Sequence, residues 1–389
     1  MDPAEPSRPA GRAPWTDAPN LPPLPAEPVV SVVIPVRDGA ASLPEAVTSA
    51  LAQRPAPAEV VIAVGPSDDG TLEVAHQLAA GHPGAIKVVD NPSGRTAEAL
   101  NTAIAHARGQ VLARVDAGSQ LPDGYLARAV EVLGRTRAAN VGGVQVPDAD
   151  HGFAAAVAAA MRSPWGTGGA AYRSGARDGP VDTVYLGVFR REALDAVGGF
   201  DPAFVRNQDA ELNVRLREAG YTVWLDPELR VRYQPRSTVR GLASQYLQYG
   251  RWRRANARAH PGSLQPRQLA PVVLVGGLLA AVGWSLVRRS AAPSVLAGGS
   301  YLGGVAAAGG HAAPDARRWP ATTLALATMH LSWGVGFLLG PPREVGRGVG
   351  DRRPRAVGRG VDGGRAREVW RGVDGGRACE VGRGAGDRS

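Results

Sequence analysis

The chain has 389 residues, of which 44% are hydrophobic and 20% charged. This length suits one large domain or two of ordinary size, with enough apolar residues for a buried core. This composition excludes a wholly disordered or collagen-like protein for most of the length. The formal net charge is +9, but the stretch from Pro341 to Ser389 holds 12 Arg against 7 Asp or Glu and carries +5 of it. The rest is nearly balanced, which argues against nucleic acid as a partner.

Both ends of the chain have a biased composition. Residues 1–28 are rich in Pro and Ala without a continuous apolar stretch, which predicts a flexible leader and no cleaved signal peptide. Residues 341–389 repeat variants of VGRGV and VDGGRA and contain no Leu, Ile or Phe, which predicts a disordered low-complexity tail. Cys379 is the single cysteine, so a disulfide framework or a Cys-rich zinc site is excluded and a reduced compartment is favoured.

From residue 29 onward, short β-rich runs alternate with helical patterns. Residues 29–36 are a continuous apolar run, typical of a strand buried on both faces. Ser42 and Glu45 are spaced as a capping box that opens a helix to about residue 53. Further strands are predicted at 59–64, 85–89 and 111–115, and a helix at 96–108. This alternation predicts an α/β fold with a mainly parallel sheet that binds ligands at the carboxyl ends of its strands.

The second half of the chain mixes strand and helix patterns less regularly and ends in apolar segments. The pattern predicts a strand at 141–146, short strands at 221–225 and 229–233 on either side of Asp226-Pro227, and helices at 207–219 and 241–258. Residues 269–287 carry no charge and are long enough to cross a bilayer; 320–340 is a second such stretch, and 291–310 is uncharged but rich in Gly, Ala and Ser. Any one of them could be a buried core helix, but together they predict a membrane region over 269–340 with two or three helices.

Asp116 and Asp209 are the carboxylates best placed for chemistry. Asp116 directly follows the predicted buried strand at 111–115, where it could hold a divalent cation or serve as a turn-forming residue before Ala117-Gly118. Asp209 and Glu211 lie in the first turn of a predicted helix, where the helix dipole and an i,i+4 pair with Arg215 explain acidic residues without any catalysis. A surface loop precedes this helix, so a carboxylate there could equally act as a general base.

Gln248, Arg251 and Trp252 place an amide, a guanidinium and an indole just before the membrane region. Arg251 could neutralise a diphosphate, because a guanidinium matches phosphate oxygens with paired hydrogen bonds. The same residues also suit an interfacial cationic helix with a Trp anchor. The sequence contains no phosphate-binding P-loop, no convincing dinucleotide motif after a strand and no GxSxG element.

The order of these features resembles that of family 2 glycosyltransferases of the GT-A fold, and within them the membrane-attached transferases of succinoglycan-type exopolysaccharide synthesis. The resemblance covers roughly residues 29–262, and the membrane segments that follow also fit. The motifs that carry it are VSVVIPV at 30–36, DGT at 69–71, NPSGR at 91–95 leading to Asn101, RVD at 114–116, YLGVFRRE at 185–192, VGGFD at 197–201, QDAEL at 208–212 and QYGRW at 248–252.

This resemblance implies a GT-A catalytic domain over 29–265 that transfers a sugar, with inversion, from a nucleotide-diphosphate sugar. Asp116 would match the first Asp of a DxD-type motif and bind Mg²⁺ or Mn²⁺, and Asp209 would match the catalytic base. Gln248, Arg251 and Trp252 would match a QxxRW motif that closes over the diphosphate and the acceptor. Arg95 and Asn101 would lie along the donor nucleotide.

The chain departs from the family pattern at three places. Val64-Gly65 replaces the usual acidic pair after the second strand, and Asp68 or Asp69 could compensate. Gly118 occupies the third DxD position, so Asp116 would need water or another residue to complete a metal site. Gln208 precedes Asp209 where the family has Glu, which keeps the carboxylate.

The resemblance also implies a location and an acceptor. The catalytic domain would face the cytoplasm, in agreement with the positive-inside rule for the residues before 269, and the acceptor would be a lipid-linked saccharide at the membrane. Three full spans would put the Arg-rich tail outside, whereas two would leave it inside. The alternatives are a polyprenyl-phosphate glycosyltransferase, a processive polysaccharide synthase, and a catalytically silent membrane scaffold with the same fold.

Overall fold

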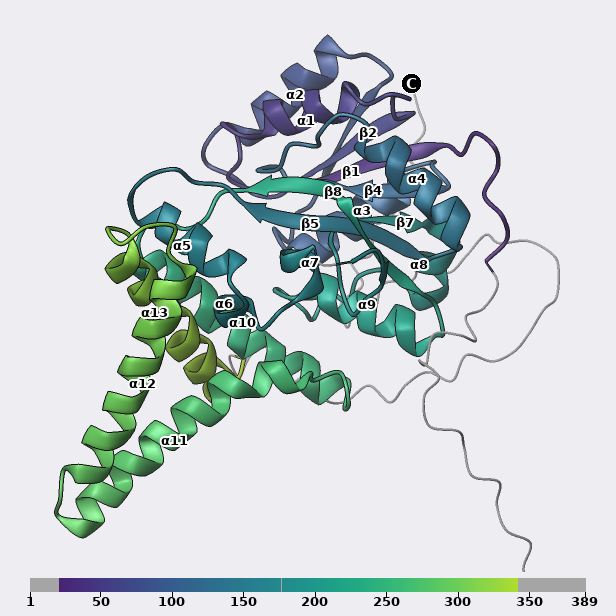
Figure 1. Ribbon diagram of the computed structural model, residues 1–389. Coiled ribbons are helices and arrows are strands. Elements are labelled where there is room, and N and C mark those ends of the chain that lie inside the picture. The colour runs from purple at the N-terminus through teal and green to yellow at the C-terminus, as the bar shows by residue number, and fades with distance from the viewer. Residues whose placement is uncertain (1–20, 176, 342–389) are drawn as a thin grey trace, which may run out of the picture. The chain divides into compact units, whose positions relative to one another are not determined.

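The computed structural model describes residues 21–175 and 177–341, and within them eight strands form one sheet (Figure 1). The strand order is β3-β2-β1-β4-β7-β5-β8-β6. The strands are β1 (Val30–Val36), β2 (Glu59–Val64), β3 (Ile86–Asp90), β4 (Val111–Arg114), β5 (Asn140–Pro147), β6 (Gly179–Pro180), β7 (Tyr185–Arg190) and β8 (Val223–Tyr233). β1 to β4 are mutually parallel, whereas β7 runs antiparallel to β4 and β5. The predicted α/β fold with a mixed, mainly parallel sheet is therefore confirmed.

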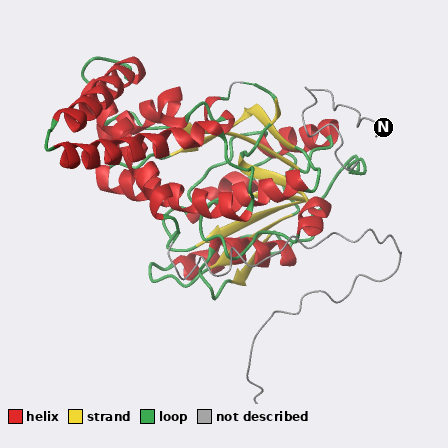
Figure 2. Cartoon of the chain, turned by 90° about the horizontal axis from the view of Figure 1, so that it is seen from below, coloured by secondary structure: helices red, strands yellow, loops and turns green. Residues whose placement is uncertain are grey.

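Helices lie on both faces of this sheet (Figure 2). One face buries apolar side chains of α1 (Leu43–Leu51), α2 (Thr71–Gly81) and α4 (Tyr125–Thr136). The other buries those of α3 (Thr96–His106), α8 (Arg191–Val197) and α9 (Gln208–Glu218). Three short helices lie between β5 and β6: α5 (Gly152–Arg162), α6 (Pro164–Thr167) and α7 (Ala171–Ser174). Since both faces are covered, strands such as β1 are buried along their whole length, as their apolar runs predict.

Two local predictions are wrong. Ser42 caps nothing: its hydroxyl contacts the Gly39 carbonyl at 3.5 Å and makes no capping hydrogen bond, so there is no capping box with Glu45. The two short strands predicted on either side of Asp226-Pro227 are one strand, β8, whose pairing with β5 shifts register at this point. The buried Asp226 carboxylate accepts a 2.8 Å hydrogen bond from Arg128, which lets an acidic residue remain inside the strand.

The first described residues already pack on the domain. Leu21 is buried in the same core cluster as Val33, and the Pro22 carbonyl accepts a hydrogen bond from the Arg190 guanidinium. Leu21 and Pro22 therefore contact the domain, although they belong to the segment that the sequence pattern assigns to a flexible leader. Residues 1–20 of the predicted leader, and the predicted disordered tail from residue 342, lie outside the described residues.

The C-terminal part of the described chain is helical: α10 (Val239–Ala259), α11 (Pro266–Arg288), α12 (Ala292–Ala312) and α13 (Trp319–Leu339). Among the described helices, α11 and α13 are long and apolar enough to cross a membrane, which by itself is weak evidence for a span. α12 lies on the predicted third segment but does not meet that criterion. α13 packs along α10 and also contacts α5, α11 and α12, so the apolar helices are joined to the sheet domain through α10 and α5 (Figure 1).

The α10–α13 contact depends on small residues. A Cβ atom on Gly250 of α10 would overlap the Trp333 carbonyl oxygen, and one on Gly336 of α13 would overlap that of Leu247. We therefore expect Gly250→Ala to destabilise the fold by about 1–3 kcal/mol, because the added methyl must push the helices apart. Thermal unfolding in detergent, followed by tryptophan fluorescence, measures the change.

The control for this substitution is Gly134→Ala. Gly134 lies within α4 and a Cβ there meets nothing within 4 Å. Alanine at such a helix position is expected to stabilise by roughly 0.5–1 kcal/mol. If Gly250→Ala raised the melting temperature as Gly134→Ala does, the close packing of α10 and α13 would be contradicted.

Candidate active site

The site is centred on Arg114 at the carboxyl end of β4. Its side chain is only 7% exposed, and its Nε donates a 2.9 Å hydrogen bond to Oδ1 of Asp116. Its Nη1 donates to Oδ1 of Asp209, the second residue of α9. One buried guanidinium thus joins two carboxylates that are far apart in sequence.

Asp116 takes part in a turn while its carboxylate remains available. The Asp116 backbone carbonyl accepts a 2.8 Å hydrogen bond from the Ser119 amide, so the residue does form a turn before Gly118. Its side chain, 38% exposed, points instead to Arg114. Burial, with the charge of Asp116 next in effect, raises the pKa of Tyr185 to about 12. Asp116 therefore presents an accessible carboxylate beside Tyr185.

Asp209 and Glu211 have different surroundings although both lie in the first turn of α9. Glu211 is buried, forms a 2.6 Å ion pair with Arg215 and contacts His260. Burial alone would raise the pKa of Glu211, but hydrogen bonds from His260 and Arg215 outweigh it and lower that pKa. Asp209 is 41% exposed and lies at a cavity. The helix-pair explanation thus fits Glu211, whereas Asp209 pairs with Arg114 and lines the cavity.

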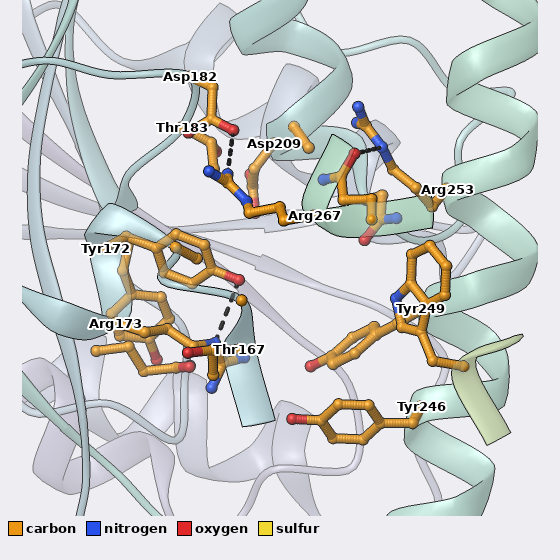
Figure 3. Close-up of a pocket in the computed structure, with 18 of the residues that line it drawn as sticks. Thr167, Tyr172, Arg173, Asp182, Thr183, Asp209, Tyr246, Tyr249, Arg253 and Arg267 are labelled. Atoms are coloured by element: carbon orange, nitrogen blue, oxygen red, sulfur yellow. Dashed lines mark hydrogen bonds and ion pairs between the residues drawn. The ribbon is translucent and has the colours of Figure 1, made fainter. Parts of the chain in front are cut away.

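A cavity of about 850 Å³ opens beside Asp116 and Asp209. Figure 3 shows Tyr172, Tyr246 and Tyr249 around it, with Arg173 lying against Tyr172. Its wall also includes apolar residues of α11 and α13, namely Ala270, Pro271, Leu274, Met329 and Trp333. The space next to the carboxylates therefore continues to the two helices that are long and apolar enough to cross a membrane.

Sequence reasoning missed several residues of this cavity. Arg114 could have been found, because a guanidinium at the end of a buried strand must have a partner. Arg173 and Asp182 could not, since they lie between β5 and β7 in a segment without strong periodicity and reach the cavity only through the fold.

The loops after β1, β2 and β3 contact one another and contribute no lining residue to the cavity in the described chain. Asp69 accepts a 3.0 Å hydrogen bond from the Ala40 amide and also bonds Thr71, which ties the loops after β1 and β2 together. These hydrogen bonds, that from the Thr71 side chain foremost, lower the pKa of Asp69. A Cβ on Gly65 would lie 3.1 Å from Gly94 Cα. Glycine at 65 therefore allows the close approach of two loops.

The predicted donor residues lie near these loops but are partly engaged elsewhere. Arg95 is 54% exposed and lies 3.8 Å from Glu98. The Asn101 amide exchanges hydrogen bonds of 2.7 and 2.8 Å with the backbone of Phe200, which holds the loop that leads to α9. A role for either residue along the donor nucleotide stays a prediction.

The QYGRW motif at 248–252 contributes one residue to the lining of the cavity in the described chain. Tyr249 lines it, whereas Gln248, Arg251 and Trp252 are not among its lining residues in the described chain. Trp252 is buried against Phe204, with ring centroids 6.1 Å apart, and so supports the loop before α9. Contact of these three residues with a diphosphate stays a prediction.

A divalent cation fits the site only if a bound diphosphate supplies further oxygen ligands. Among the described residues no group of three or more His, Cys, Asp or Glu side chains is arranged to hold a metal ion. Asp116 is accessible, and Gly118 brings no ligand to the third position of the motif. Mg²⁺ commonly binds through one or two carboxylates, substrate phosphates and water, so a single accessible Asp suits a cation that arrives with a diphosphate.

The contact of His260 with α9 makes the stability of this region depend on pH. Burial opposes the charged ring, but the hydrogen bond to Glu211 and the charges of Glu211 and Glu218 outweigh it and raise the pKa of His260. The stabilisation is complete below about pH 6.5 and is lost as pH rises through the raised pKa of His260.

The wild-type melting temperature should therefore fall as pH rises through this pKa, and we expect His260→Gln to remove that decrease. His106→Gln, at an exposed position of α3, is the control, and an unchanged profile for His260→Gln would contradict the role of His260.

Comparison with known proteins places this chain in a family. Residues 26–255 match the family described as "Glycosyltransferase like family 2". The succinoglycan biosynthesis protein ExoA of Rhizobium meliloti is 38% identical over 291 residues, which cover 73% of this chain and 86% of that protein. The chain therefore belongs to glycosyltransferase family 2.

A more distant relative and a solved structure are also similar. The dolichyl N-acetyl-α-D-glucosaminyl phosphate 3-β-D-2,3-diacetamido-2,3-dideoxy-β-D-glucuronosyltransferase of Methanococcus voltae is 26% identical over 49% of this chain and 62% of its own length. The mannosyltransferase PcManGT of Pyrobaculum calidifontis, solved with GDP-Man and Mn²⁺, has a TM-score of 0.54 and 22% identity over 83% of this chain and 91% of its own. The latter likeness supports the GT-A-like fold.

Proposed function

We propose that this glycosyltransferase moves a sugar, with inversion, from a nucleotide-diphosphate sugar to a lipid-linked saccharide in exopolysaccharide or other cell-surface polysaccharide synthesis. The observation that carries the proposal is Arg114 joining Asp116 and Asp209 at a cavity that continues to α11 and α13. The names of two relatives support it, one through succinoglycan biosynthesis and the other through a dolichyl-linked sugar phosphate.

Asp209 acts as the general base in this proposal. Its carboxylate takes the proton from an acceptor hydroxyl while that oxygen forms a bond to the anomeric carbon of the donor sugar. The bond from the anomeric carbon to the nucleoside diphosphate breaks, and the diphosphate leaves with the electron pair. Attack opposite to the leaving group inverts the anomeric configuration. Arg114 donates a hydrogen bond to Asp209 and would keep its carboxylate oriented toward the acceptor.

Asp116 would hold Mg²⁺ or Mn²⁺ together with oxygens of the donor diphosphate. Such a cation, when bound, neutralises charge on the leaving group. Arg95 and Asn101 belong to the donor side in this proposal, and Gln248, Arg251 and Trp252 belong to the segment that closes over the diphosphate. The loops after β1 to β3, which do not line the cavity in the described chain, would supply the nucleotide site.

The catalytic domain would lie at the cytoplasmic face of the membrane, where activated sugars are made. The apolar α11 and α13 support membrane attachment. The acceptor would then enter the cavity from the side that α11 and α13 line.

Membranes containing the protein, incubated with a panel of radiolabelled nucleotide sugars in the presence of Mn²⁺ or EDTA, test the proposal. Metal-dependent label in the lipid extract is the expected result. Label that accumulates as a long polymer would favour a processive synthase, and transfer to bare polyprenyl phosphate would favour that class of transferase. If no nucleotide sugar is bound or turned over, the silent scaffold replaces the proposed activity.

A further inference from the structure

Three arginines from three different helices share the wall of the cavity. They are Arg217 of α9, Arg253 of α10 and Arg267 of α11. Figure 3 shows Arg253 and Arg267 together with Asp182, which forms a 2.6 Å ion pair with Arg267. One carboxylate therefore faces three guanidinium groups, and this part of the cavity has an excess of positive charge.

Arg253 is the most buried of the three, at 7% exposed. Its hydrogen bonds go to neutral acceptors: Nε donates to Gln268 Oε1 at 2.9 Å, and Nη2 donates to the Ser263 carbonyl. Burial foremost, and then the like charges of Arg217 and Arg267, lower the pKa of Arg253 to about 10 despite the opposing charge of Asp182. Buried cations without enough counter-charge are costly, so this arrangement is one that a bound anion would stabilise.

The position of the cluster distinguishes this anion from the donor nucleotide. The loops after β1, β2 and β3 contribute no lining residue to the cavity in the described chain. Just beyond Arg267, in contrast, α11 lines the cavity with Ala270, Pro271 and Leu274. The ligand that satisfies both surfaces has an anionic group attached to an apolar chain.

We propose that Arg217, Arg253 and Arg267 bind the phosphate or diphosphate that links the acceptor saccharide to its lipid. Guanidinium groups suit this task because they meet phosphate oxygens with paired hydrogen bonds and stay charged. The anchored phosphate would fix how far the acceptor saccharide reaches toward Asp209. This inference rests on the proposed function, because it assigns the acceptor end of the same site.

Binding of farnesyl diphosphate to the detergent-solubilised full chain tests the cluster directly. Quenching of tryptophan fluorescence gives the dissociation constant, with farnesol and inorganic pyrophosphate as separate probes. Arg217→Gln and Arg267→Gln are each expected to weaken farnesyl diphosphate binding roughly 10-fold, and the double variant more. Arg258→Gln, which removes the same charge from an exposed position of α10, is expected to bind as the wild type does. Melting temperatures confirm that the variants are folded.

Nucleotide binding and donor turnover separate this inference from the proposed function. In the double variant, the dissociation constants of UDP and GDP and the slow hydrolysis of an accepted donor sugar should stay within about twofold of wild type, a difference below about 0.5 kcal/mol. Equal loss of nucleotide and farnesyl diphosphate would overturn the acceptor assignment, as would equal loss in Arg258→Gln. If the arginine substitutions leave farnesyl diphosphate binding unchanged, the acceptor assignment is overturned even if sugar transfer is found. If no donor is turned over, the proposed function fails, whereas the binding result still decides whether this cluster holds an isoprenoid phosphate.

Discussion

Asp209→Asn is expected to lower kcat on the order of 10³-fold, the typical effect of losing a positioned general base. The substitution is close to isosteric, and the amide oxygen can still accept the hydrogen bond from Arg114 that the carboxylate accepts. The loss would therefore come from proton transfer rather than from a displaced α9. Since Asp209 does not lie in the loops after β1 to β3, the KM for the donor sugar should change little. Initial rates of label transfer at varied donor concentration measure both constants.

Asp148→Asn is the matched control for this experiment. Asp148 also pairs with an arginine, Arg232 at 3.7 Å, but is not among the lining residues of the cavity. It should keep a rate close to wild type, which shows that losing an Asp–Arg pair is not by itself harmful. An Asp209→Asn protein that melts normally and keeps more than about a tenth of the wild-type rate would contradict the assignment of the base.

The parts of the fold that sequence predicts are those with a local cause. The continuous apolar run at 29–36 predicts a strand buried on both faces, and β1 is such a strand. The strands predicted at 59–64 and 111–115 are confirmed as β2 and β4. Asp116 follows directly from this, because a carboxylate after a buried strand must emerge at the ligand-binding edge of the sheet. Two local patterns mislead. The strand break predicted at Asp226 is absent because Arg128 hydrogen-bonds that carboxylate inside β8. The capping box predicted at Ser42 is absent because Ser42 makes no capping hydrogen bond.

The joined site depends on contacts that no local pattern contains. Arg114 and Asp209 are 95 residues apart, and only the packing of α9 against the sheet brings them together. The face that α10 turns to the cavity is likewise set by its packing against α13 and the Phe204 loop, so Tyr249 and Arg253 line the cavity while Trp252 is buried. The cluster of like charges around Arg253 forms only when three helices pack together, so the sequence alone does not predict it.

Asp116→Asn is expected to reduce the transfer rate about 10²-fold at a fixed, moderate Mn²⁺ concentration, because the site offers a cation few other protein ligands. An amide oxygen binds divalent cations more weakly than a carboxylate does, so part of this loss should be recovered at high Mn²⁺. That recovery distinguishes a weakened metal site from a disrupted fold. The measurement is the rate of label transfer as a function of Mn²⁺ concentration, with Asp148→Asn as the control.

Asp209→Asn provides the opposite pattern, which makes the two substitutions informative together. A lost base leaves the rate low at every Mn²⁺ concentration, whereas a weakened metal site shifts the concentration that gives half the maximal rate. Because Arg114 contacts both carboxylates, replacing either aspartate also changes the electrostatic surroundings of the other aspartate. The double variant should therefore fall short of the product of the two single effects, as expected for residues that share one hydrogen-bond network. Full multiplicativity, or an Mn²⁺ dependence of Asp116→Asn equal to that of wild type, would show that Asp116 does not hold the cation next to the base.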